Sequence, residues 1–235
     1  MSIVYHGNPT TGQQGWTAQN GSLTFAHTHT AGRDLILCTV LGLGAHSSGT
    51  VAPTYDGVSL SELAQKMILG YPGQLHAYHR LPDPGSKTAN IVIPATTTDS
   101  IKGFVAWVLE VSGLSATPIG ASNQSADDHW TGSLAFSIAA TLQATDSLTL
   151  AMMGVKSGAG TAISLASPLT QIGTLEETSD SNAPLVGLGY KLSDGAGSKT
   201  YTGSWAGSSA YEQASVLELK ATSASIPSKP RVIWI

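Results

Sequence analysis

Apolar and polar residues alternate along several short segments of the chain, which is the period-two pattern of a β-strand. The clearest example is Phe104-Val105-Ala106-Trp107-Val108-Leu109-Glu110-Val111. In the first half of the chain the pattern predicts strands near residues 22–30, 34–43, 53–60, 74–81, 88–94 and 103–112. Only residues 60–69 are compatible with a short helix, and a strand fits them equally well. The sequence therefore predicts an all-β protein.

The second half of the chain repeats the first. Ser22-Leu23-Thr24-Phe25 matches Ser133-Leu134-Ala135-Phe136, an offset of 111 residues. A longer match runs from Tyr78 to Thr88 and from Tyr190 to Thr200, and ends in Gly-Ser-Lys-Thr both times at an offset of 112. Ordered matches at a nearly constant offset predict two copies of one six-strand unit, at residues 22–112 and 133–220.

Six strands do not easily bury both of their faces, whereas twelve strands in two sheets make a filled core. We therefore predict one pseudo-symmetric, two-sheet, jelly-roll-like β-sandwich over residues 1–220. Two small tandem sandwiches, joined by residues 113–132, are the alternative. Residues 221–235 form an extended tail, with a stiff polar linker before an apolar tip.

Composition excludes several partners. Only 11% of residues are charged, the net charge is −4, and no Lys/Arg cluster could neutralise a row of phosphates, so we expect no nucleic-acid partner. No run of 18 apolar residues predicts a membrane span. The first residues lack a basic start followed by an apolar stretch, so we expect synthesis in a cytoplasm without a signal peptide.

A pair of histidines is the first candidate for a metal site. His27 and His29 lie on one face of a predicted strand, where the second unit has Ile138 and Ala140. Zinc or nickel would need a third ligand, and no other histidine lies at a spacing that predicts convergence. We interpret the pair as partly buried, hydrogen-bonded histidines, and we expect no metal and no cofactor.

The acidic residues and serines give no support for an enzyme. Glycoside hydrolysis needs two carboxylates that face each other, but Glu176 and Glu177 are adjacent and would point to opposite faces of a strand. Glu110 and Glu218 are single acids on repeated strands, and we expect them to be solvated. The sequence contains no Gly-x-Ser-x-Gly nucleophile motif. We predict no catalytic residue.

One polar segment is compatible with sugar binding. Asp127, Asp128, His129 and Trp130 combine acids with a large aromatic ring, and such a ring stacks on the apolar faces of sugars. The competing interpretation is that Trp130, like Trp16 before the first unit, caps an end of the sandwich.

The end of the sequence is a second interaction candidate. Arg231, Val232, Ile233, Trp234 and Ile235 follow a segment that contains Pro227 and Pro230. An exposed Trp with three aliphatic neighbours predicts a contact with a partner, or with the chain's own sandwich.

The turns and strand ends of this chain resemble a known family. The segments Thr54-Tyr55-Asp56-Gly57-Val58-Ser59-Leu60, Leu81-Pro82-Asp83-Pro84-Gly85 and Val111-Ser112-Gly113-Leu114-Ser115-Ala116-Thr117-Pro118-Ile119-Gly120 are similar to a concanavalin-like or jelly-roll β-sandwich domain found in bacteriophage virion proteins and bacterial surface proteins. The resemblance implies a fold and a virion location, and it brings no catalytic residues.

On this basis we expect a non-enzymatic structural or accessory protein of a bacteriophage virion, as a head decoration or a tail-associated part. It would act through contacts with capsid or tail proteins, as a homo-oligomer. The alternative is a lectin-like receptor-binding module that recognises a glycan on the host surface.

Overall fold

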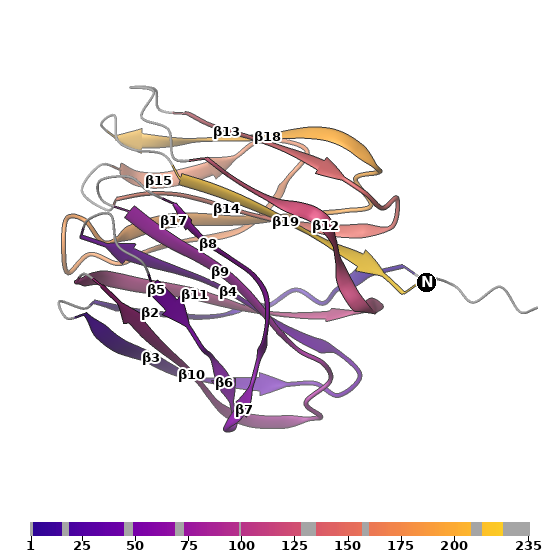
Figure 1. Ribbon diagram of the computed structural model, residues 1–235, viewed down its shortest axis with the longest axis horizontal. Coiled ribbons are helices and arrows are strands. Elements are labelled where there is room, and N and C mark those ends of the chain that lie inside the picture. Colours follow the sequence, from indigo (N-terminus) through magenta and orange to yellow (C-terminus); the bar gives the residue numbers. More distant parts are fainter. Residues whose placement is uncertain are drawn as a thin grey trace, which may run out of the picture.

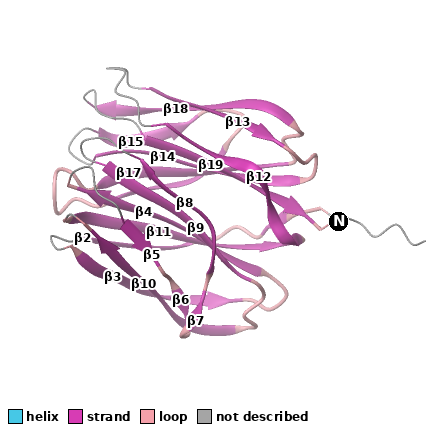
Figure 2. Ribbon diagram, viewed as in Figure 1, coloured by secondary structure: helices cyan, strands magenta, loops and turns pink. Residues whose placement is uncertain are grey.

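The computed structural model describes residues 2–15, 19–44, 49–68, 73–98, 100–127, 135–156, 160–207 and 213–222 (Figure 1). All regular structure in these residues is β-strand, and Figure 2 shows no helix among them. The all-β prediction is confirmed, and residues 61–68, compatible with a helix or a strand in the sequence, form a strand. No helix in this part of the chain is long and apolar enough to cross a membrane.

Nineteen strands are described. The first unit contains β1 (Val4–Tyr5), β2 (Thr10–Gly15), β3 (Asn20–His29), β4 (Asp34–Leu43), β5 (Gly49–Val51), β6 (Thr54–Tyr55), β7 (Val58–Ser59), β8 (Ser61–Ile68), β9 (Gly73–Leu81), β10 (Lys87–Thr97) and β11 (Ile101–Ser112). The second contains β12 (Leu114–Asp127), β13 (Ala135–Leu142), β14 (Ser147–Lys156), β15 (Gly160–Leu165), β16 (Thr170–Glu176), β17 (Pro184–Leu192), β18 (Gly197–Gly207) and β19 (Gln213–Ala221).

These strands form four antiparallel sheets. In the first unit, inner sheet 1 has the order β1-β11-β4-β9-β8, with β2 also paired to β11, and outer sheet 1 has the order β3-β10-β6-β7, with β5 also paired to β10. In the second unit, inner sheet 2 has the order β12-β19-β14-β17-β16, and outer sheet 2 has the order β13-β18-β15. The sheets stack in four layers, with the two inner sheets in the middle (Figure 1).

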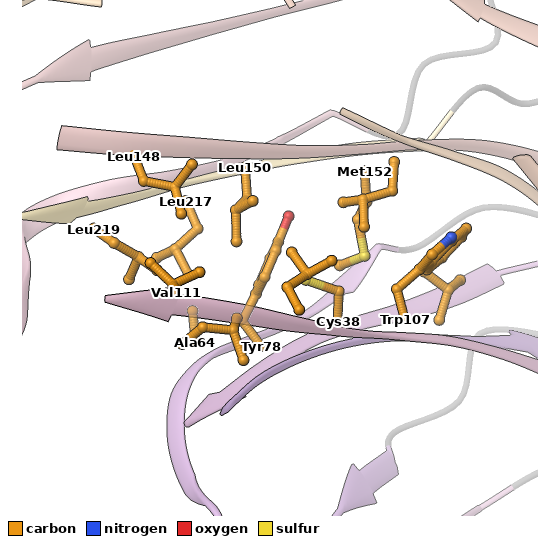
Figure 3. Close-up of a cluster of buried hydrophobic side chains, with 14 of the residues drawn as sticks. Cys38, Ala64, Tyr78, Trp107, Val111, Leu148, Leu150, Met152, Leu217 and Leu219 are labelled. Carbon is orange, nitrogen blue, oxygen red and sulfur yellow. The ribbon is translucent and has the colours of Figure 1, made fainter. Parts of the chain in front are cut away.

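Three apolar layers fill the spaces between the four sheets. One lies between the sheets of the first unit around Leu37 and Phe104, and another between the sheets of the second unit around Met153 and Phe136. The third lies between the inner sheets, where side chains from both units point toward one another (Figure 3). The labelled members from the first unit are Cys38, Ala64, Tyr78, Trp107 and Val111, and those from the second unit are Leu148, Leu150, Met152, Leu217 and Leu219.

The predicted arrangement of twelve strands in only two sheets is therefore wrong. The reason lies in the inner strands, because β4 and β14 are buried at almost every position and so need a cover on both faces. The outer strands β3 and β13 instead alternate between buried and exposed residues, as a sheet with one face in water requires. Each unit is a two-sheet sandwich, and the two sandwiches share a third apolar layer.

The two inner sheets repeat one strand order, so that β11, β4, β9 and β8 correspond to β19, β14, β17 and β16. Glu110 and Glu218 anchor this correspondence, because each is buried and accepts hydrogen bonds from the backbone of the turn before β4 or β14. With these two acids aligned, the ladders place Tyr190 at the position of Arg80. The sequence match pairs Tyr190 with Tyr78 instead, two residues away.

Glycines let a loop of the second unit approach the first unit closely. A Cβ atom at Gly42 would lie 2.8 Å from Cδ of Pro184 and 3.1 Å from the backbone oxygen of Asn182. At Gly103 it would lie 2.9 Å from a carboxylate oxygen of Glu177. Nearby, Lys102 forms an ion pair with Asp180 at 3.3 Å. The contact between the two sandwiches thus depends on positions without side chains.

We predict that Gly42→Ala destabilises the protein by about 1–3 kcal/mol, because the added methyl group must push the loop at Pro184 away from β4. The matched control is Gly173→Ala on β16, where the nearest atom to a new Cβ is Nε1 of Trp107 at 3.9 Å. Urea unfolding of both variants checks this. Equal effects of the two substitutions would contradict the close approach.

Candidate functional site

The two predicted histidines lie at one corner of the first sandwich, on the inward face of β3. His27 is 5% and His29 is 1% exposed, and both side chains make hydrogen bonds. Nδ1 of His27 lies 2.8 Å from the hydroxyl of Thr10, and Nδ1 of His29 lies 3.1 Å from the carbonyl oxygen of Gly85. Their inward orientation, expected from the alternation of side chains on the strand, is confirmed.

Glu110 is the acid of this corner, and it is buried rather than solvated as we expected. It accepts hydrogen bonds from the Arg33 guanidinium at 2.6 Å and from the Thr30 amide at 2.9 Å. Burial alone would raise the pKa of Glu110, but these hydrogen bonds outweigh it, and the pKa lies below its ordinary value. The carboxylate therefore holds the β3–β4 turn against β11.

Glu218 repeats this structural role in the second unit. It is fully buried and accepts hydrogen bonds from the amides of Gln143 and Ala144, in the β13–β14 turn. The expectation that Glu218 is solvated is therefore wrong. On a repeated strand, a buried acid that satisfies turn amides has the same sequence signal as an exposed one, so alternation alone could not distinguish them.

The chemistry of the histidine corner is limited by what surrounds it. Nε2 of His27 and Nε2 of His29 are buried and have no hydrogen-bond partner, and Nε2 of His27 lies 3.5 Å from Oε1 of Glu110. Burial lowers the pKa of His27, although Glu110 partly opposes this effect. Across the described residues, no three His, Cys, Asp or Glu side chains gather in a way that could hold a metal ion.

A chain of hydrogen bonds between the two inner sheets was not predicted from the sequence. His76 on β9 and Ser215 on β19 come from different units, and Nδ1 of His76 lies 2.8 Å from the Ser215 hydroxyl. Nε2 of His76 lies 2.9 Å from Oε1 of Gln74, whose amide nitrogen donates to the Val155 carbonyl oxygen at 3.2 Å. The Tyr78 hydroxyl lies 2.8 Å from that of Ser215. The partners come from distant parts of the chain, so no local pattern indicated them.

The donor and the acceptor of each of these hydrogen bonds follow from the contact between Gln74 and Val155. Because the Gln74 amide nitrogen donates to Val155, its oxygen must accept the proton on Nε2 of His76. Nδ1 of His76 then accepts from Ser215, and the Ser215 oxygen accepts from Tyr78. Every polar group is satisfied in one arrangement, with a neutral histidine.

A serine that donates to a histidine is also the geometry of a nucleophile and its base. Here the pair is not accessible to a substrate, because Ser215 and His76 are both 0% exposed. Burial also lowers the pKa of His76 to about 3, far below the range of a useful general base at neutral pH. The hydrogen-bonded chain joins the two sandwiches and leaves no room for a reaction.

A cleft opens at the surface where β8 lies against β12. Its volume is about 310 Å³, and Arg80 lies at its base. Arg80 donates at 2.8 Å to Asp34 and at 2.8 Å to the carbonyl oxygen of Ser115. The walls consist of Ser61, Glu62, Leu63, Pro82, Ala116, Thr117, Pro118 and Ile119. A cleft this small fits a single side chain or a small fragment.

The two predicted interaction segments lie largely outside the described residues. The backbone of Asp127 ends β12, whereas its side chain and Asp128, His129 and Trp130 lie outside that part of the chain. The same is true of Arg231, Val232, Ile233, Trp234 and Ile235. Both assignments stay predictions.

Comparison with known proteins gives no further guidance. No family model matches the chain, and no curated protein matches it.

We predict that Ser215→Ala destabilises the protein by about 1–3 kcal/mol, because it leaves the buried Nδ1 of His76 without a partner. The Tyr78 hydroxyl would keep only its hydrogen bond to the backbone oxygen of residue 215, at 3.2 Å. Ser137→Ala, at an exposed position of β13, is the control and should change stability by less than about 0.5 kcal/mol. A fluorophosphonate probe, which reacts with nucleophilic serines, should leave Ser215 of the folded protein unlabelled. Labelling there would contradict the structural role.

The buried histidines also predict how stability depends on pH. Burial lowers the pKa of His76 to about 3 and that of His79 to about 4, so both stay neutral in the folded protein where an unfolded chain would be protonated. Stability should therefore be fully present above pH 6.5 and be lost as the pH falls from 6.5 toward 4 and 3. Each histidine contributes a slope of about 1.4 kcal/mol per pH unit in that window.

Urea unfolding between pH 7 and pH 4.5 measures this slope, with His76→Gln as the comparison. The variant should lose stability less steeply than the parent protein as the pH falls. Parallel pH profiles of the two proteins would show that His76 is not held neutral.

Proposed function

We propose that this protein is a non-enzymatic structural component that works through protein–protein contacts. The observation that favours this most is the composition of the two outer faces. On β3, β10, β13, β15 and β18 the outward residues are all uncharged and mostly small. They are Ser22, Thr24, Ala26, Thr28, Thr88, Asn90, Val92, Pro94, Thr96, Ala135, Ser137, Ala139, Thr141, Ala162, Ser164, Thr200, Thr202, Ser204 and Ala206.

Outer faces this poor in charge are unusual for a protein that remains isolated in water. The first face carries Asp56, in the turn between β6 and β7, which pairs with Lys87 at 2.9 Å and lies beside Thr88 and Asn90. Charged side chains on exposed strands normally oppose association, and their absence favours contact with another surface. Short Ser, Thr and Ala side chains also let a partner approach closely without placing buried charges in the contact. Polar groups paired across strands, such as the hydroxyls of Thr28 and Thr88 at 2.9 Å, add to the rigidity of the face.

The interior supports the same proposal. The histidine corner, the two acids and the hydrogen-bonded chain of His76 each have a structural role that accounts for them. Because these side chains are buried, a substrate would not reach any of them. Four packed sheets with two outer faces poor in charge suit a structural component of an assembly better than a catalyst.

The resemblance to virion β-sandwich domains supports placing this role in a bacteriophage particle, as a head decoration or a tail-associated part. The repeated strand order of the two inner sheets supports an origin by duplication of one jelly-roll-like sandwich. In such a particle, a duplicated sandwich would present two related faces to neighbouring subunits.

Mass spectrometry of density-purified particles, from a lysate of cells that carry the coding sequence, tests this proposal. We expect the chain to sediment with capsid and tail proteins at a fixed copy number after high-salt washing. A chain found only in the unassembled fraction would contradict the virion role.

A further inference from the structure

The correspondence between the two units relates two positions between the inner sheets. Aromatic rings fill one of these positions, and a cleft opens at the other. On β17, Tyr190 pairs with Leu150, which pairs in turn with Leu217 on β19. On β9, Arg80 pairs with Ile36, which pairs with Leu109 on β11. Since Glu110 and Glu218 align the strands, Leu109 corresponds to Leu217, and Arg80 occupies the position of Tyr190.

The neighbours of these two residues correspond as well. Tyr5 on β1 lies opposite Val111, and Ile119 on β12 lies opposite Leu219. Tyr5 and Tyr190 pack together, with ring centroids 4.7 Å apart, and burial beside Tyr190 raises the pKa of Tyr5 to about 12. When the two units are exchanged, Ile119 of the second unit takes the place of Tyr5 and Arg80 of the first takes the place of Tyr190, and the cleft of about 310 Å³ opens beside them.

The cleft has the chemistry to receive an aromatic ring. Leu63, Pro118 and Ile119 provide apolar walls, and Arg80 provides a planar cation fixed by Asp34. A guanidinium held in place is a good surface for stacking an aromatic ring. The twin position is filled by an aromatic ring of this chain, so the shape of the site favours one here too.

Two strand edges border the cleft. β8 is the last strand of inner sheet 1, and β12 is the last strand of inner sheet 2, so each pairs with a neighbour on one side only in the described sheets. An extended segment can add to such an edge through its backbone while a side chain enters an adjacent pocket. The cleft therefore fits an extended peptide with one large aromatic residue.

The sequence contains such a peptide at residues 231–235, which we call the tail segment. Trp234 is flanked by Ile233 and Ile235, and Arg231 supplies a positive charge that complements the exposed Glu62 at the rim of the cleft. The thirteen residues after Thr222 can span at most about 40 Å. That distance is enough to reach a neighbouring molecule.

The direction in which the polypeptide leaves β19 favours docking of the tail segment on a second copy rather than on its own molecule. Thr222 donates from its amide to Gly113 and from its hydroxyl to Leu114, both at 2.8 Å, so the chain leaves past the beginning of β12. The cleft residues Ala116–Ile119 lie further along β12, in the opposite direction. Entry into its own cleft would require a reversal, which Pro227 and Pro230 oppose because they favour an extended backbone.

We propose that the cleft between β8 and β12 binds the tail segment of a second copy of this chain, with Trp234 stacked on Arg80 and Arg231 paired with Glu62. The proposal rests on the assembly role proposed above and names one contact of that assembly. A tail that enters the next molecule, which offers its own tail in turn, links copies head to tail.

Disulfide trapping in the full-length chain tests this. Ala116→Cys combined with Ile235→Cys should give covalent dimers and longer species under mild oxidation. The natural Cys38 does not interfere, because it is fully buried and burial raises the pKa of its thiol. Ser137→Cys with Ile235→Cys, which places the cysteine on the outer face of β13, is the matched control and should cross-link at least about tenfold less.

Two further substitutions in the trapping variant show whether the cleft is responsible. Trp234→Ala removes the aromatic ring, and Ile119→Tyr introduces the residue that fills the twin position. Each should lower the yield of cross-linked dimer at least about tenfold while the melting temperature stays within a few degrees of the parent. Undiminished cross-linking in both variants would overturn the proposal.

The nature of the product separates the remaining outcomes. A disulfide within one chain would show that the tail enters its own cleft, and an absence of cross-links would show that it does not dock there. Either result overturns the proposal. If the protein is found in particles but does not cross-link, the docking proposal fails and the virion role stands. If it cross-links but is absent from particles, docking is supported and the virion role is refuted.

Discussion

The face-to-face packing of the two inner sheets is the contact on which the rest of the structure depends. β4 and β14 are apolar on both sides, so each unit alone would expose a large apolar surface. Pairing the units covers both surfaces at once and produces the layer around Trp107 and Leu150 (Figure 3). With the two inner sheets covered on both faces, only the outer sheets present a face to water, and those outward faces are polar.

Polar groups inside this contact determine how the two units sit together. Apolar layers tolerate sliding, but the hydrogen bonds from His76 to Ser215 and from Gln74 to Val155 join the two units and require one register between them. The glycines at 42 and 103 add a steric condition, because the loop at Pro184 fits only against positions without side chains. Burial strengthens the hydrogen bonds of His76 as a connection between the units, and the same burial keeps a substrate away from His76 and Ser215. A serine–histidine contact is evidence of chemistry only where a substrate can reach it.

The two inner sheets share one strand order, so the positions at which the two units differ are informative. Glu110 and Glu218 keep the same role in both units. Where they differ, the cause is local, as at the corner where His27 and His29 replace Ile138 and Ala140. The substitution of Arg80 and Ile119 for a packed tyrosine pair has a larger effect, because it leaves a cleft at the surface rather than a change within the core.

Short-range patterns in the sequence determined the strands and the small, charge-poor surface. Alternation located β3, β10 and β11 to within a few residues, and the continuous apolar run at residues 35–41 already contained the signal of a strand covered on both faces. The tertiary structure decided the number of layers, the burial of Glu110 and Glu218, and the meeting of His76 with Ser215. The contacts of Glu110, Glu218 and His76 join residues between 74 and 139 positions apart in the sequence. An alternating pattern shows that a face is buried without showing what buries it.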